Sequence, residues 1–205
     1  MKKIIALLLA LTCVFALVAC GDDPAPTPDG GDTPNYENLA PFTAAIAASN
    51  PASASISVSQ IATQFNVTMN GEYDVVYNED GSATIEYSYD KFNEITDETT
   101  EVTTTVTGTA TVAADGTVTG SVNSTVTAAT AIKVALDGAK LGAYTVEAGA
   151  LIAKVSAADT AAIIGVAISA DVTLTITIAN DKVATMTISY ETNLGPAEIV
   201  CAYNY

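Results

Sequence analysis

From Ser53 onward, most of the chain alternates apolar residues with hydroxylated ones at a period of two. This period puts successive side chains on opposite faces of a β-strand, whereas a helix needs a period near 3.6. Turn pairs such as Asp80-Gly81, Asp115-Gly116 and Asp137-Gly138 divide the region into short segments. The pattern therefore predicts a mainly β fold built on an antiparallel sheet of about nine to eleven strands.

The first predicted strands contain a change of phase. Apolar residues occupy even positions from Ala54 to Val58 and odd positions from Ile61 to Met69. A slip of one residue at Gln60-Ile61 predicts a bulge or a short break. Asn70-Gly71, between two alternating segments, predicts a type I′ hairpin, with a bulge inside a longer strand as the alternative.

The middle of the chain is rich in threonine. Apolar residues hold even positions from Val102 to Leu136, and five odd positions carry Thr103, Thr105, Thr107, Thr109 and Thr111. Such a row suits a solvated strand face, and a binding surface is the less common alternative. Two short strands are expected around Ala148-Gly149, and the last three over residues 171–178, 183–190 and 197–205, with a turn at Asn180-Asp181.

Two helices are expected beside the strands. Residues 36–50 form the first, capped by Asn38 and with Pro41 in its first turn. Its apolar stripe is Leu39, Phe42 and Ile46. A capping box at Ser156–Asp159 opens a short late helix that Gly165 ends.

The N-terminus has the pattern of a signal peptide, so we expect a leader there. Lys2 and Lys3 precede sixteen uncharged residues, 4–19, which is short of the roughly 20 needed to span a bilayer. The stretch Leu17-Val18-Ala19-Cys20 then resembles the lipobox of bacterial lipoproteins. That resemblance implies cleavage between Ala19 and Cys20 and attachment of a diacylglyceryl group to the Cys20 sulfur. An ordinary secretory signal is the alternative. The expected location is extracytoplasmic, in the bacterial cell envelope, anchored to a membrane through this lipid.

Residues 20–35 join the leader to the rest of the chain. Residues 21–35 hold four Asp, four Pro and three Gly but no large apolar side chain, so they predict a semi-extended tether. The domain prediction is therefore a signal peptide over 1–19, a lipidated tether over 20–35 and a single β-rich domain over 36–205.

The charge balance restricts the partners. Loss of Lys2 and Lys3 with the leader changes the formal charge from −16 to −18. Such a surface repels nucleic acid and anionic lipid headgroups, so we expect no nucleic-acid partner and an anchor that depends on acyl chains. Protein partners cannot be named from the sequence.

The chain lacks the residues of many catalytic sites. It has no His and no Arg, which excludes His-based triads, His metal sites and arginine phosphate clamps. Candidate carboxylate pairs, Glu79/Asp80 and Glu98/Glu101, fall in predicted turns. We therefore expect no catalytic residue, no metal, no cofactor and no enzyme activity. Cys201 alternates in phase with Ile199 and Tyr203, which predicts a buried apolar thiol.

The order of elements resembles the lipoprotein-carrier superfamily of the LolA and LppX type. The resemblance covers roughly residues 36–205 and implies a curved antiparallel sheet or half-barrel whose concave face holds acyl chains. Only six leucines follow the leader, so inward positions would leave a cavity for a lipid or other apolar ligand. Its wall would consist of Tyr73, Tyr77, Tyr87 and Tyr89. The alternative is a structural or surface-interaction module with a filled core.

Overall fold

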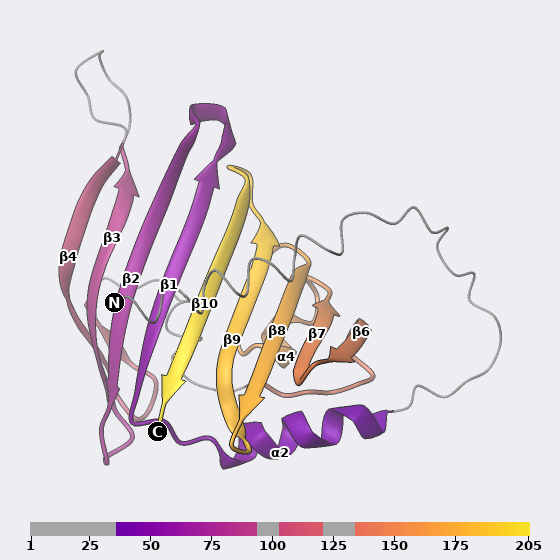
Figure 1. Cartoon of the computed structure of the whole chain (residues 1–205). Helices are drawn as coiled ribbons and strands as arrows, with labels where there is room; N and C mark the ends of the chain where they lie inside the picture. The colour runs from indigo at the N-terminus through magenta and orange to yellow at the C-terminus, as the bar shows by residue number, and fades with distance from the viewer. Residues whose placement is uncertain (1–35, 94–102, 121–133) are drawn as a thin grey trace. The chain divides into compact units, whose positions relative to one another are not determined.

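A computed structural model describes residues 36–93, 103–120 and 134–205. These residues contain ten strands in one open, wholly antiparallel sheet of order β5-β4-β3-β2-β1-β10-β9-β8-β7-β6 (Figure 1). The predicted fold class, a mainly β antiparallel sheet with an N-terminal helix and a short late helix, is confirmed. The strands are β1 Ser53–Ala62, β2 Val67–Tyr77, β3 Ala83–Phe92, β4 Thr103–Val112, β5 Val118–Thr119, β6 Leu141–Glu147, β7 Ala150–Val155, β8 Val172–Ala179, β9 Lys182–Glu191 and β10 Pro196–Asn204.

The first and last strands meet in the middle of the sheet. Strands β1 to β5 form one meander and β6 to β10 another, and each strand pairs with the next in sequence. Antiparallel pairing of β1 with β10, from Ser53↔Asn204 to Gln60↔Ala197, joins the two meanders. This long-range pairing makes one sheet out of two sequence-local halves.

The sheet has an inner, apolar face and an outer, polar face. The inner face carries the fully or almost fully buried side chains Ala54, Ile56, Val75, Ile85, Ile188, Ile199 and Cys201. Because successive strand residues point to opposite faces, the outer face carries the intervening residues, such as Ser55, Ser57, Ser59, Thr107 and Glu198. Alternation in the sequence therefore predicted the two faces correctly over most of the strands.

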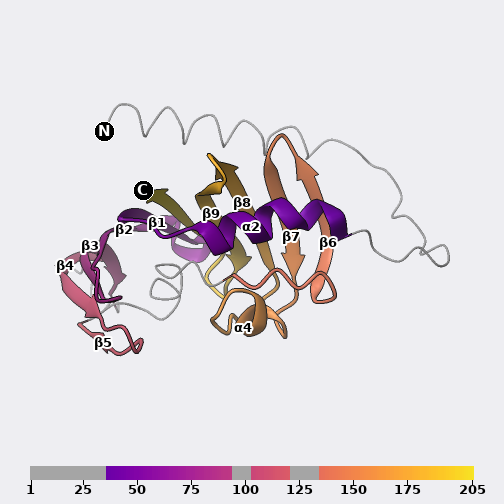
Figure 2. The same cartoon turned by 90° about the horizontal axis from the view of Figure 1, so that it is seen from below.

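Helix α2, Ala40–Ala48, packs on β8 and β9 (Figure 2). A 3₁₀ turn over Tyr36–Leu39 precedes it, and Pro41 lies in its first turn as expected. Leu39 and Phe42 are buried in the same core cluster as the inner face, and Ile46 packs against that cluster. The predicted Asn38 cap is wrong, because Asn38 lies inside the 3₁₀ turn and Leu39 is the N-cap, without a side-chain hydrogen bond.

The predicted hairpin at Asn70-Gly71 is wrong. Strand β2 runs straight through this pair, and its register with β1 is continuous from Ser53↔Val76 to Ala62↔Val67, so the alternative of a bulge is wrong too. The connection is instead the 3₁₀ turn Thr63–Phe65, followed by Asn66 at a left-handed φ of 51°. Ten uninterrupted pairs with β1 outweigh the local turn preference of an Asn-Gly pair.

The phase change also lies elsewhere than predicted. Strand β1 keeps its even inward phase to its last residue, since Ala62 is buried and Ile61 is 41% exposed on the outer face. The odd inward phase begins in β2, after the turn at Thr63–Phe65. The turn therefore absorbs the slip, and β1 has no bulge against β2 or β10.

Most of the other predicted turns are confirmed. Gly81 and Gly116 adopt positive φ in the β2–β3 and β4–β5 turns. In the two-residue turns Ala148-Gly149 and Asn180-Asp181, both residues have positive φ, the type I′ signature.

Helix α4, Thr160–Ile163, is shorter than the predicted late helix. The Ser156 hydroxyl donates to the Asp159 carboxylate at 2.7 Å. Asp159 is the N-cap but makes no side-chain capping bond, so the predicted capping box is wrong. Gly165 follows at a φ of +85°.

Several predictions concern residues outside the described ranges. They include the leader, the tether, Cys20 and the inward positions Val122, Val126 and Ile132. Val134 is described and buried, but it lies in no strand, so the predicted strand does not extend that far. Within the described part of the chain, no helix has the length and apolar character needed to cross a bilayer.

Candidate functional site

The four tyrosines of the predicted ligand wall all lie on the inner face, on β2 and β3. Three of them form one cluster, with ring centroids 5.7 Å apart for Tyr87 and Tyr89, 6.3 Å for Tyr73 and Tyr87, and 6.5 Å for Tyr73 and Tyr89. The last pair is nearly parallel, at 9° between ring planes. Such separations are typical of attractive aromatic pairs, so the rings stabilise one another.

Two glycines make room for these rings. Gly71 pairs with Tyr89 across β2 and β3, and Gly108 pairs with Tyr87 across β3 and β4. A Cβ atom at Gly71 would lie 2.9 Å from the Tyr73 ring and 3.1 Å from the Tyr89 Cβ atom. A glycine inside a strand commonly marks a close approach of this kind, and this signal was available in the sequence.

Tyr77 is separate from this cluster and belongs to a second group with Cys201 and Tyr203. Cys201 is fully buried, as its phase predicted, and burial raises the pKa of its thiol to about 12. Burial also raises the pKa of Tyr77, with a smaller contribution from Cys201. The Cys201 thiol is therefore protonated and unreactive at neutral pH.

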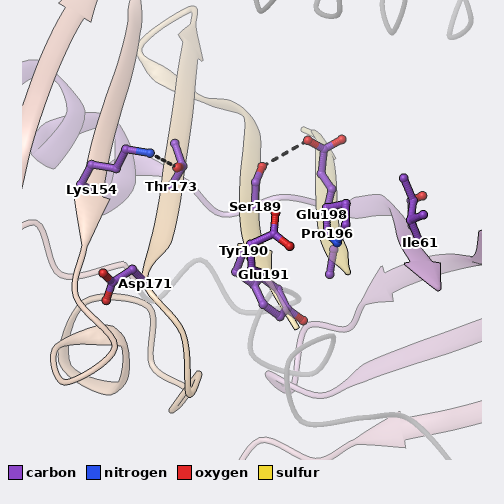
Figure 3. A pocket seen from close by; sticks show the side chains of 11 residues that line it. Ile61, Lys154, Asp171, Thr173, Ser189, Tyr190, Glu191, Pro196 and Glu198 are labelled. Atoms are coloured by element: carbon purple, nitrogen blue, oxygen red, sulfur yellow. Dashed lines mark hydrogen bonds between the residues drawn. The ribbon is translucent and has the colours of Figure 1, made fainter. Parts of the chain in front are cut away.

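A hollow of about 510 Å³ lies elsewhere, on the outer face, and none of the four tyrosines lines it. Its floor follows one row of paired residues across four strands, Lys154↔Thr173, Thr173↔Ser189 and Ser189↔Glu198, and Ser59 continues the row on β1. Figure 3 shows the side chains of Lys154, Thr173, Ser189 and Glu198 projecting from neighbouring strands. The full lining is Ser59, Ile61, Lys154, Asp171, Thr173, Ser189, Tyr190, Glu191, Pro196, Ala197 and Glu198.

Hydrogen bonds order this row. The Lys154 ammonium donates to the Thr173 hydroxyl at 2.6 Å, and the Ser189 hydroxyl donates to the Glu198 carboxylate at 3.2 Å (Figure 3). At one end, the Asp171 carboxylate accepts a hydrogen bond from the Ala157 backbone N–H at 2.9 Å.

The balance of charge in the hollow is negative. Its lining holds one ammonium group and three carboxylates, from Asp171, Glu191 and Glu198. A surface of this composition favours a ligand that carries positive charge or donates hydrogen bonds. Among the residues described, no three acidic or thiol side chains come together in a way that could hold a metal ion.

Sequence reasoning missed this hollow. Its residues come from five strands and from Asp171 just before β8. They span positions 59 to 198 and become neighbours only through the strand order. The threonine row, in contrast, was recognised from the sequence. Thr105, Thr107, Thr109 and Thr111 are exposed on the outer face of β4.

Comparison with models of known protein families and with the sequences of curated proteins finds no match. The interpretation of the candidate site therefore depends on its geometry alone.

Proposed function

We propose that this chain is an extracytoplasmic lipoprotein of the bacterial cell envelope, anchored through lipid on Cys20, that binds a macromolecular partner with the outer face of its sheet. The observation that carries this proposal is the position of the 510 Å³ hollow. It lies on the polar, outward side of the sheet, among side chains that offer hydrogen bonds and negative charge. Polar groups of this kind suit a protein or glycan surface better than an acyl chain.

The inner face supports an apolar ligand less well. Tyr73 is buried, and it packs against Tyr87 and Tyr89 over the space that the glycines leave free. The aliphatic inner side chains join α2 and the α4 region in one core cluster. A sheet filled in this way favours an interaction module over a lipid carrier.

The anchor follows from the lipobox resemblance and the composition of the tether. Fifteen residues, 21–35, separate Cys20 from the first described residue, and a proline-rich chain extends by up to about 3.1 Å per residue. The domain would therefore work within about 45 Å of the membrane that holds the lipid. After loss of Lys2 and Lys3 with the leader, its net charge of −18 would keep it off anionic headgroups.

Photo-cross-linking in intact cells tests the proposal. A photoreactive residue is placed in the full chain at Ser189, inside the hollow, and in parallel at Tyr89 on the inner face. We expect adducts with a macromolecule from Ser189 and none from Tyr89. Adducts with lipid from Tyr89, together with none from Ser189, would support the apolar-ligand hypothesis and overturn the proposal.

Native mass spectrometry of the chain purified from membranes provides the second arm. An interaction module should carry no lipid beyond the covalent one on Cys20. A co-purified fatty acid or phospholipid that a Tyr73→Ala variant releases would contradict the proposed function.

A further inference from the structure

Exposed apolar side chains gather at one end of the sheet. Seven large apolar residues are well exposed in the described part of the chain, and three of them lie here: Ile61 (41%), Phe65 (42%) and Leu194 (37%). Phe92 at the end of β3 packs on Phe65 with ring centroids 4.9 Å apart. We call these four residues the apolar tip. Single exposed apolar residues are ordinary, but a cluster marks an interaction site.

Two turns that are far apart in sequence hold the tip together. The Thr63 backbone N–H donates to the Leu194 carbonyl at 2.9 Å, which joins the β1–β2 and β9–β10 turns. The Gln60 side-chain amide donates to the Thr192 hydroxyl at 3.0 Å and to the Gly195 carbonyl at 3.1 Å. A pre-organised apolar surface of this kind binds with a smaller entropy cost than a mobile loop.

A glycine is required where the two turns touch. Gly195 has a φ of +139°, and a Cβ atom there would lie 2.6 Å from the Ile61 carbonyl oxygen and collide with the Thr63 hydroxyl. The close contact between the turns is therefore built into the sequence at Gly195. It keeps the β9–β10 turn, which carries Leu194, against the β1–β2 turn.

The tip is continuous with the acidic hollow. Ile61 belongs to the tip and also lines the hollow. Glu191 and Pro196, which flank the β9–β10 turn, line the hollow as well. The two features therefore form one surface, apolar at the strand ends and negative beside them.

Helix α2 lies at the opposite end of the strands from the tip (Figure 1). The Val183 backbone N–H, at the start of β9, donates to the hydroxyl of Ser49, the C-cap of α2, at 3.0 Å. The tip lies beyond the far end of β9, about 33 Å away for a strand of ten residues (Figure 1).

The negative charge beside the tip restricts which kind of molecule could bind there. A second copy of the chain, which is equally acidic, and an anionic bilayer would both be repelled by the carboxylates beside the tip. A glycan would find no hydrogen-bonding group in the side chains of Ile61, Phe65 and Leu194. A protein surface with apolar residues flanked by Lys or Arg complements both features.

We propose that the apolar tip and the adjoining acidic hollow form one docking surface for a basic protein partner that presents exposed apolar side chains. This inference rests on the proposed function and specifies its partner.

Cross-linking from the tip tests it. A photoreactive phenylalanine analogue replaces Phe65 in the full chain in intact cells, and a matched variant carries it at Val76, which is 55% exposed on the outer face at the other end of β2. We expect an adduct from position 65 and none from position 76. The cross-linked partner peptide, read by mass spectrometry, should contain more Lys and Arg than Asp and Glu.

Charge reversal provides the second readout. In the position-65 background, Glu191→Lys with Glu198→Lys should lower the adduct yield about tenfold or more, whereas Glu86→Lys on β3, away from the hollow, should leave it unchanged. Equal amounts of the variant chains in the cells show that each one folds.

Other outcomes overturn the inference. An adduct with phospholipid, with glycan or with a second copy of this chain would identify a different occupant. The absence of any adduct at position 65 would disprove the proposed docking surface. Adducts from Ser189 without adducts from position 65 would overturn this inference and leave the proposed function standing.

Discussion

The Tyr87 ring lies across Gly108, its partner on β4, so closely that a Cβ atom at Gly108 would be 2.5 Å from the tyrosine hydroxyl oxygen and 2.8 Å from Cζ. A glycine inside a strand usually weakens the strand, but Gly108 also provides space for the Tyr87 ring. It leaves room for the ring on the inner face, where the ring also contacts Tyr73 and Tyr89.

The first prediction concerns this contact. Gly108→Ala should lower the free energy of unfolding by about 1–3 kcal/mol, because the added methyl group forces Tyr87 away from its neighbours. Urea unfolding followed by far-UV circular dichroism gives the free energy, and the near-UV signal of the tyrosines reports their displacement.

A double-mutant cycle provides the control. In a Tyr87→Ala background, Gly108→Ala should stabilise the protein by about 0.5–1 kcal/mol, because alanine loses less backbone entropy than glycine in a strand. The same destabilisation in both backgrounds would show that Tyr87 is not the cause.

The second prediction concerns alkaline pH. The folded protein keeps the Cys201 thiol protonated, with its pKa raised from 9.0 to about 12, while the unfolded chain loses that proton near pH 9. The stabilisation that the folded state gains from keeping this thiol protonated is therefore fully present below about pH 9. It is lost as the pH rises toward 12. Tyr73, with its pKa raised to about 12 by burial, adds to the loss above pH 10.

The melting temperature should therefore fall from pH 9 upward. Cys201→Ala should make the fall between pH 9 and 10 shallower and leave the profile below pH 8 parallel to that of the wild type. A thiol reagent should label Cys201 only upon unfolding. Rapid labelling of the folded protein at pH 7 would show that the thiol is accessible.

The third prediction concerns the β6–β7 turn. Ala148 has a φ of 49°, a left-handed conformation that costs an alanine about 1–2 kcal/mol. Ala148→Asn should raise the free energy of unfolding by about 0.5–1 kcal/mol, because asparagine tolerates this conformation and Asn-Gly is the favoured type I′ pair. Thermal and urea unfolding measure it. Asn66→Ala, which puts alanine at a similar φ of 51°, should have the opposite sign.

The fourth prediction tests the anchor. Cys20→Ala should abolish labelling of the chain by a palmitate analogue, because Cys20 alone follows the Leu-Val-Ala lipobox pattern. Unprocessed precursor or a released soluble form should appear instead. Cys201→Ala is the matched control and should keep both the label and the membrane fraction. Label that persists in Cys20→Ala and disappears in Cys201→Ala would disprove the interpretation of the N-terminus.

Local patterns in the sequence determined which face of the sheet most side chains occupy. The period of two put Ile56, Ile85 and Cys201 inside and Thr105, Thr107, Thr109 and Thr111 outside, and all of them lie there. Turn pairs with a strong local preference, such as Asp80-Gly81 and Asn180-Asp181, also form as predicted. These features depend on residues close together in the chain, so a single sequence is enough to identify them.

Pairing between strands that are far apart in the sequence decided the other features of the fold. The Asn70-Gly71 pair has the composition of a turn, yet it lies inside β2, because continuous pairing with β1 and the ring of Tyr73 over Gly71 stabilise the extended strand. The outer hollow and the apolar tip arise only once β10 pairs with β1, which brings residues near 60 beside residues near 195. Only the tertiary structure could show either surface, because hydrogen bonds between strands depend on which segments meet, and alternation is the same whichever strand is the neighbour.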